Sequence, residues 1–239
     1  MEIDILPKTE RAQTHMVFIV VPRFNIMTLI TMIETLRIAN YLAPASIYSW
    51  EVASFDDSKI IASNGMTATI KTANDNLQSA EFVFILGSWG TEHYHNKKLT
   101  AWLRKRVRAG ERICGVELGS YIVARAGLLD GKLATIHWSW LNGFKENFNR
   151  VEVEESLFTL DRKVMTCSGG LAGVDLMLRL IEEINGSSFS GEIADQMLHH
   201  PIRSAISPQR GTMGRSTETM RPLLREAMTL IENNIEEPL

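Results

Sequence analysis

The sequence is poor in cysteine and in basic excess, and both shortages exclude classes of protein. Its 239 residues include two cysteines, Cys114 and Cys167, which are too few for a disulfide scaffold. Both lie in apolar, strand-like runs, which predicts buried and reduced thiols. The formal net charge of −3 lacks the positive surplus typical of chains that bind nucleic acid themselves. We therefore expect any contact with DNA to lie outside this chain.

Long hydrophobic runs are also missing. No apolar stretch approaches the roughly 20 residues needed to cross a bilayer, and the N-terminus lacks the apolar segment of a signal peptide. We therefore expect a cytoplasmic protein that does not enter a membrane. With 45% hydrophobic and 22% charged residues, the chain is long enough for one sizeable core, or for one domain with an appendage.

Apolar runs of strand length alternate with helical patterns along the chain. The continuous run at residues 16–21 predicts a central strand covered on both faces, and Asn25 is placed to cap the helix that follows. Further strands are expected at residues 50–55, 82–86, 113–116 and 163–167, a hairpin around Asn64-Gly65, and a strand pair within 151–160. This alternation predicts an α/β fold with a doubly wound, mostly parallel sheet and a site at the carboxyl ends of its strands.

Residues 112–138 contain the most informative pattern. The apolar run Ile113–Val116 is followed by a turn at residues 117–119 and by a helical run that ends at Gly127. A strand, a sharp turn and a helix in this order expose the turn side chain above the sheet and aim the positive end of the helix dipole at it. The residue expected at this elbow is Glu117.

This stretch resembles the nucleophile elbow of the PfpI-like, class I glutamine amidotransferase-like superfamily, in the form found in GlxA-family members of the AraC/XylS transcriptional regulators. The resemblance rests on Gly-x4-Ala-x-Ala-Gly-Leu-Leu-Asp-Gly at 119–131, followed by Thr135, His137 and Trp138. It implies a flavodoxin-like fold. Enzymes of the superfamily carry a cysteine on the elbow, whereas this chain has Glu117, and a hydrated carboxylate is a poor nucleophile toward amides. No catalytic residue is therefore expected.

The loops at the carboxyl ends of the strands should converge on one crevice. A carboxylate beside aromatic rings suits a quaternary or cationic amine, and backbone amides at the elbow would suit the carboxylate of a zwitterion. The resemblance implies an effector that is betaine-like, carnitine-like or similar to a cationic amino acid. No cofactor and no metal are expected. The predicted ligand-binding residues are Glu117, Trp89, His137, Trp138, Phe24, Glu34, Ser88, Leu118 and Gly119.

The expected organisation has four parts. Residues 1–14 are a loose leader, 15–200 a PfpI-like ligand-sensing domain and 201–219 a linker, and 220–239 resemble the start of an AraC-type helix-turn-helix domain cut short at Leu239. The resemblance implies a transcriptional regulator, expected to be an activator. It would bind DNA through a C-terminal domain absent from this chain and would pair as a homodimer.

Other interpretations of the same residues stay open. Glu117 could be a protonated carboxyl in a buried network, His137 a structural histidine, Trp138 a core residue, and Glu34 an ion-pair partner of Arg37. The histidine pairs 93/95 and 199/200 lack the further ligands of a metal site. Two other functions also remain: an active amidase or hydratase that uses Glu117 and His137 as an acid-base pair, and a purely structural dimerisation module.

Overall fold

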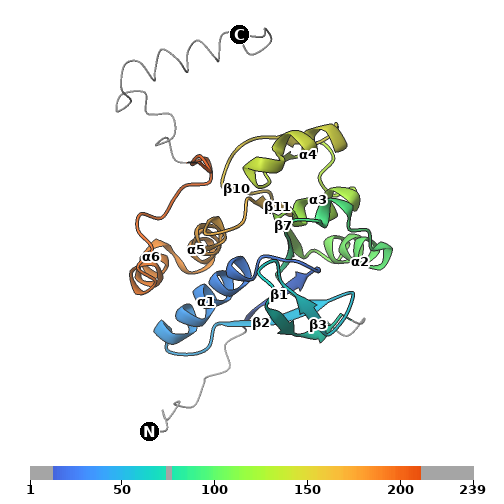
Figure 1. Ribbon diagram of the computed structural model, residues 1–239. Helices are drawn as coiled ribbons and strands as arrows, with labels where there is room; N and C mark the ends of the chain where they lie inside the picture. The colour runs from blue at the N-terminus through green and yellow to red at the C-terminus, as the bar shows by residue number, and fades with distance from the viewer. Residues whose placement is uncertain (1–12, 74–76, 211–239) are drawn as a thin grey trace, which may run out of the picture. The chain divides into compact units, whose positions relative to one another are not determined.

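A seven-stranded sheet forms the centre of the computed structural model, which describes residues 13–73 and 77–210. The strand order is β10-β11-β7-β6-β1-β2-β5, and all neighbours are parallel except the pair β10 and β11 (Figure 1). This confirms the predicted mostly parallel sheet. The strands are β1 (Thr14–Val20), β2 (Tyr48–Ser54), β5 (Lys71–Thr72), β6 (Phe82–Gly87), β7 (Arg112–Glu117), β10 (Phe158–Thr159) and β11 (Val164–Cys167).

Helices cover both faces of this sheet. The α-helices are α1 (Ile26–Leu42), α2 (Lys97–Arg108), α3 (Gly119–Arg125), α4 (Leu141–Asn147), α5 (Ala172–Asn185) and α6 (Ser187–Gln196), and the short 3-10 helices are η1 (Thr91–His93) and η2 (Trp138–Trp140). Helices α1, α5 and α6 pack on one face, and α2, α3 and α4 on the other (Figure 1). The fold is therefore doubly wound, as predicted.

Strand β1 shows why the sequence has an uninterrupted apolar run at its centre. Phe18 points into the core under α1 and α5, while Val17 and Ile19 point into the core under α2 and α3, and all three are fully buried. Burying each such side chain stabilises the fold by about 1.5–3 kcal/mol. The predicted helix cap is also confirmed, because the Asn25 side chain accepts hydrogen bonds from the amides of Met27 (3.1 Å) and Thr28 (3.4 Å).

Two small sheets lie beside the main one. Strands β3 (Lys59–Ile61) and β4 (Thr67–Thr69) are antiparallel and enclose Gly65, whose φ is +85°, so the predicted hairpin is confirmed. The two strands predicted within 151–160 are present, but they do not pair with each other. Strand β9 (Glu152–Val153) pairs with β8 (Leu133–Ala134), whereas β10 joins the main sheet through β11. Strands β8, β9 and β10 have two residues each. Their pairing therefore depends on contacts with segments that are distant in the sequence.

The compact unit extends past both expected boundaries. Strand β1 begins at Thr14, and the unit ends at Gln209 rather than at residue 200. The amide of Leu157 donates to the carbonyl of Ala205 at 2.8 Å, which holds the added segment against the sheet edge. The predicted leader up to residue 12 and the expected elements of 211–239 lie outside the described residues. In the described ranges, no helix has the length and apolarity needed to cross a membrane.

Candidate functional site

The elbow predicted at Glu117 is present. Glu117 is the last residue of β7, has a φ of +55°, and is followed two residues later by the start of α3. A left-handed backbone is unfavourable for a residue with a Cβ, so the surrounding contacts must hold it there. Gly119 supplies one such contact, because a Cβ at this position would lie 1.9 Å from the carbonyl oxygen of Ile85. Only glycine lets the turn pass this close to β6.

Glu117 lines a cavity of about 310 Å³ at the carboxyl ends of the parallel strands. Loops that follow β1, β6, β7 and β11 contribute to it, as expected for a doubly wound sheet. A volume of this size suits a small metabolite. The lining residues are Asn25, Met27, Ser63, Ser88, Trp89, Glu117, His137, Ser168, Gly169, Gly170 and Gln209.

The carboxyl group of Glu117 is buried and has few partners. Its side chain is 6% exposed, and the Ser88 hydroxyl donates to Oε1 at 3.0 Å. Oε2 has no hydrogen-bond partner among the described residues. Burial raises the pKa of Glu117 to about 7, although Ser88 and, more weakly, Asn25 favour the ionised form. Near neutral pH both the protonated and the ionised form of Glu117 are therefore populated.

The walls around Glu117 contain no fixed positive charge. No lysine or arginine belongs to the described lining. The imidazole of His137 is the remaining basic group, and burial lowers its pKa below the ordinary 6.5, so it is mainly neutral at pH 7. The backbone of Gly169 approaches the acid closely, because a Cβ there would lie 2.7 Å from the Cβ of Glu117. Among the described residues, no cationic side chain thus compensates the ionised carboxylate.

Four of the predicted ligand-binding residues meet in this cavity: Glu117, Ser88, Trp89 and His137. The Trp89 side chain is 59% exposed at the mouth, and His137 Nδ1 lies 2.8 Å from the Ser139 hydroxyl. Two more residues, Leu118 and Gly119, lie inside the elbow and shape it from beneath.

The Leu118 amide donates to the carbonyl of Gly87 at 3.1 Å. This amide is therefore not free for a ligand carboxylate.

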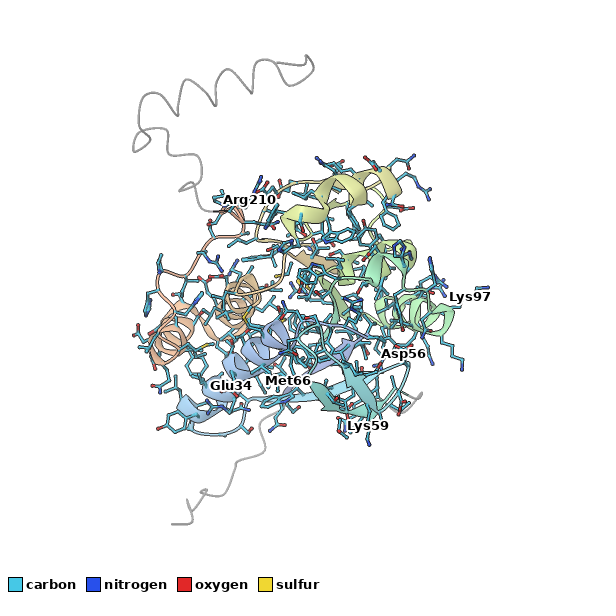
Figure 2. All side chains as sticks on the ribbon, in the orientation of Figure 1. Glu34, Asp56, Lys59, Met66, Lys97 and Arg210 are labelled. Carbon is cyan, nitrogen blue, oxygen red and sulfur yellow. The ribbon has the colours of Figure 1, made fainter. Side chains whose placement is uncertain are left out.

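The structure does not bring Phe24, Glu34 or Trp138 to the cavity lining. Phe24 is fully buried in the core between the sheet and α1. Glu34 lies on α1, nine residues after Asn25 and so about 13 Å along the axis, where it pairs with Arg37 at 2.7 Å (Figure 2). The Trp138 ring is 44% exposed and contacts the His137 ring, with centroids 5.5 Å apart. Of the two tryptophans expected to enclose the ligand, the described lining therefore contains Trp89 and not Trp138.

Several lining residues were not predicted, and Gln209 is one of them. It falls in the segment expected to be a linker, yet its Nε2 donates to the carbonyl of Ile136 at 2.8 Å and its Oε1 accepts from the amide of Trp138 at 2.7 Å. Nothing in the local sequence indicates these contacts. The turn Ser168–Gly170 did carry a signal, since glycines before a helix often approach a ligand site closely.

His199 and His200 each lie beside an aspartate. His199 Nε2 lies 2.9 Å from Asp175 and His200 Nε2 lies 2.7 Å from Asp195. Across residues 13–73 and 77–210, no group of three or more His, Cys, Asp or Glu side chains is arranged to hold a metal ion. Cys114 and Cys167 are buried free thiols, as predicted, and burial raises the pKa of Cys167 to about 12.

Comparison with known proteins agrees with this geometry. The DJ-1/PfpI family pattern matches residues 16–183. The HTH-type transcriptional regulator GbdR of Pseudomonas aeruginosa is 33% identical over 234 residues, which cover 98% of this chain and 64% of that protein. The HTH-type transcriptional regulator GlxA of Rhizobium meliloti is 31% identical over 223 residues, covering 93% and 69%. The chain therefore spans about two thirds of the length of these regulators.

Solved structures show the same fold. The crystal structure of an AraC family transcriptional regulator from Pseudomonas putida superposes with a TM-score of 0.71 at 20% identity. The match covers 77% of this chain and 98% of that one.

Proposed function

Because the chain belongs to the DJ-1/PfpI family and resembles helix-turn-helix regulators over most of its length, we propose that it is the ligand-sensing domain of a transcriptional regulator. Its effector in this proposal is a small cationic amine held in the cavity at Glu117. We further propose that the protein acts as a homodimer and an activator in the cytoplasm. DNA binding belongs, in this proposal, to a C-terminal helix-turn-helix domain outside these 239 residues.

The observation that carries the proposal is the uncompensated acid of the cavity. Glu117 is 6% exposed, and its described surroundings offer one hydrogen bond and no cationic side chain. A cation that enters the cavity supplies the missing charge and shifts Glu117 fully to its ionised form. Trp89 can add a cation–π contact of about 0.5–2 kcal/mol. An anionic ligand would instead meet a like charge.

The remaining walls fit the other end of a small zwitterion. Ser63 and Ser168 line the cavity. Hydroxyl groups can donate to a carboxylate without neutralising it. Betaine-like, carnitine-like and cationic amino-acid-like compounds, which the family resemblance suggested, all combine an ammonium group with such an end.

Calorimetric titration against glycine betaine, L-carnitine and L-arginine tests the proposal. The matched control for glycine betaine is 3,3-dimethylbutanoate, which replaces the nitrogen by carbon and keeps the shape. We expect the control to bind about 2–4 kcal/mol more weakly, because it lacks the cation–π contact and leaves Glu117 uncompensated. Glu117→Gln should weaken glycine betaine far more than the control. Equal affinities for both compounds, or wild-type affinity in the variant, would assign Glu117 to an internal network.

An enzymatic role for Glu117 and His137 is the competing function. A carboxyl group that titrates near pH 7 suits general acid-base catalysis. However, His137 Nδ1 interacts with Ser139, and the Leu118 amide, the natural oxyanion donor at an elbow, donates to Gly87. We expect no turnover of glutamine, simple amides or isonitriles. A rate above buffer that disappears in Glu117→Gln would establish the enzyme instead.

A further inference from the structure

Gln209 has two structural roles. It lines the Glu117 cavity, and it is the last residue of the compact unit. Its Nε2 lies 3.1 Å from Thr135 Oγ1, 2.8 Å from the Ile136 carbonyl oxygen and 2.9 Å from the Ser156 carbonyl oxygen. Its Oε1 accepts from the amide of Trp138 at 2.7 Å. These contacts use the full donor capacity of a primary amide.

The partners of Gln209 form a fixed, buried frame. The Thr135 amide donates to Thr166 Oγ1 at 2.7 Å, and the Thr135 hydroxyl donates to the Ser156 carbonyl at 2.8 Å. Both threonines are fully buried. The same loop carries His137 to the cavity. Gln209 is therefore one wall of the cavity and also holds the loop that supplies another wall.

The side chain of Gln209 is also the anchor of the segment that precedes it. Ala205 is bound to the sheet edge through Leu157, but the next hydrogen bonds along the described chain are local, between Ser204 and Ser207. Ile206 is 81% exposed. If Gln209 leaves its frame, little else in the described contacts holds residues 206–209 in place.

From this arrangement we infer that Gln209 couples effector occupancy of the cavity to the docking of residues 204–209, the connection toward the C-terminal part of the chain. The inference rests on the proposed sensing function and adds its regulation. A compound that touches Gln209 or His137 binds the docked form better, because the undocked form lacks one wall. By linkage, the same compound must shift the connection toward the docked form.

The test compares Gln209→Glu with Gln196→Glu. Gln209→Glu keeps the side-chain length and an acceptor, but it loses both N–H donors and places a carboxylate beside the carbonyls of Ile136 and Ser156. Gln196→Glu makes the same charge change at an exposed position. Hydrogen exchange of the peptide 204–210 is followed with and without the tightest binder among glycine betaine, L-carnitine and L-arginine, and calorimetry gives the affinity. Gln209→Met adds no charge to the cavity, so it gives the affinity, and it also replaces Gln209→Glu in the exchange measurement if that variant does not fold.

We expect the bound compound to slow exchange at 204–210 on the order of tenfold in the wild type and in Gln196→Glu. Gln209→Glu should exchange faster without ligand, and Gln209→Met, which adds no carboxylate to attract the cation, should bind about tenfold more weakly. A purely structural role of Gln209 would not produce ligand-dependent protection. Binding by the wild type with unchanged exchange, or equal affinity in Gln209→Met, overturns the coupling alone. Absence of binding by all three compounds contradicts the sensing function and the coupling with it.

Discussion

Two buried acids of this protein have opposite surroundings. Asp175 on α5 is fully buried and receives four hydrogen bonds, from the backbone amide, Nε and Nη2 of Arg203 at 2.8, 3.0 and 2.6 Å and from His199 Nε2 at 2.9 Å. Glu117 is almost as buried, but among the described residues its carboxyl group receives a hydrogen bond from Ser88 and a weaker contribution from Asn25. A buried charge is tolerated when the protein supplies its partners. Asp175 is thus a structural anchor, while Glu117 leaves room for a partner from outside.

The largest effect on stability is expected from removing the carboxylate of Asp175. Asp175→Ala leaves Arg203 and His199 without their shared acceptor, so we expect the free energy of unfolding to fall by about 3–5 kcal/mol. Urea unfolding followed by tryptophan fluorescence measures the loss. The control is Asp195→Ala, whose carboxylate is 75% exposed beside His200 and should matter by less than about 1 kcal/mol. Equal effects of the two substitutions would refute the structural role.

For Glu117, removing the acid should raise the free energy of unfolding at pH 8 rather than lower it. The pKa of Glu117 is raised by burial from 4.5 to about 7, so the folded protein holds its proton where the unfolded chain has released it. Stability therefore falls as the pH rises from 4.5 to 7, by about 3 kcal/mol, and stays low above pH 7. Glu117→Gln removes this penalty. We expect it to be more stable than the wild type at pH 8 and similar at pH 4.5, and a less stable variant at pH 8 would contradict the assignment.

Ligand binding sharpens the comparison further. A cation favours ionised Glu117, so its affinity should rise with pH up to about 7 and then level off, by roughly 30-fold between pH 5.5 and 8. Protonation of His137 at low pH would oppose the cation as well and so acts in the same direction. Titrations of glycine betaine at several pH values test this. In Glu117→Gln most of the pH dependence of the affinity should vanish. An unchanged pH profile in this variant would show that Glu117 does not contact the ligand.

Glu34 provides the smallest expected effect. Its carboxylate pairs with Arg37 on the exposed side of α1, and pairs of this kind contribute less than about 0.5 kcal/mol. Glu34→Gln should change neither the stability beyond that amount nor the affinity for glycine betaine. A loss of affinity comparable to that of Glu117→Gln would show that Glu34 contributes to ligand binding.

The sequence alone was enough to predict elements whose causes are local. The run at residues 16–21 predicts a strand buried on both faces because every side chain in it is apolar, and β1 confirms this. Asn25 caps α1 because its short amide side chain reaches the first free amides of the helix. The elbow at Glu117 follows from an apolar strand, a turn and a glycine that admits close contact with β6. Family resemblance then indicated the fold.

Only the tertiary structure decided which side chains share the cavity. Phe24 and Glu34 follow the first strand as the predicted crevice required, yet Phe24 is buried in the core just before α1 begins, and α1 carries Glu34 away from the cavity. Gln209 lies 92 positions after Glu117 and reaches the same cavity through contacts with Thr135, Ile136 and Ser156. Local propensities act over a few residues, whereas such contacts depend on the packing of the whole unit. The electrostatic character of Glu117 has the same origin, because burial and the absence of a described cationic neighbour are properties of the folded chain.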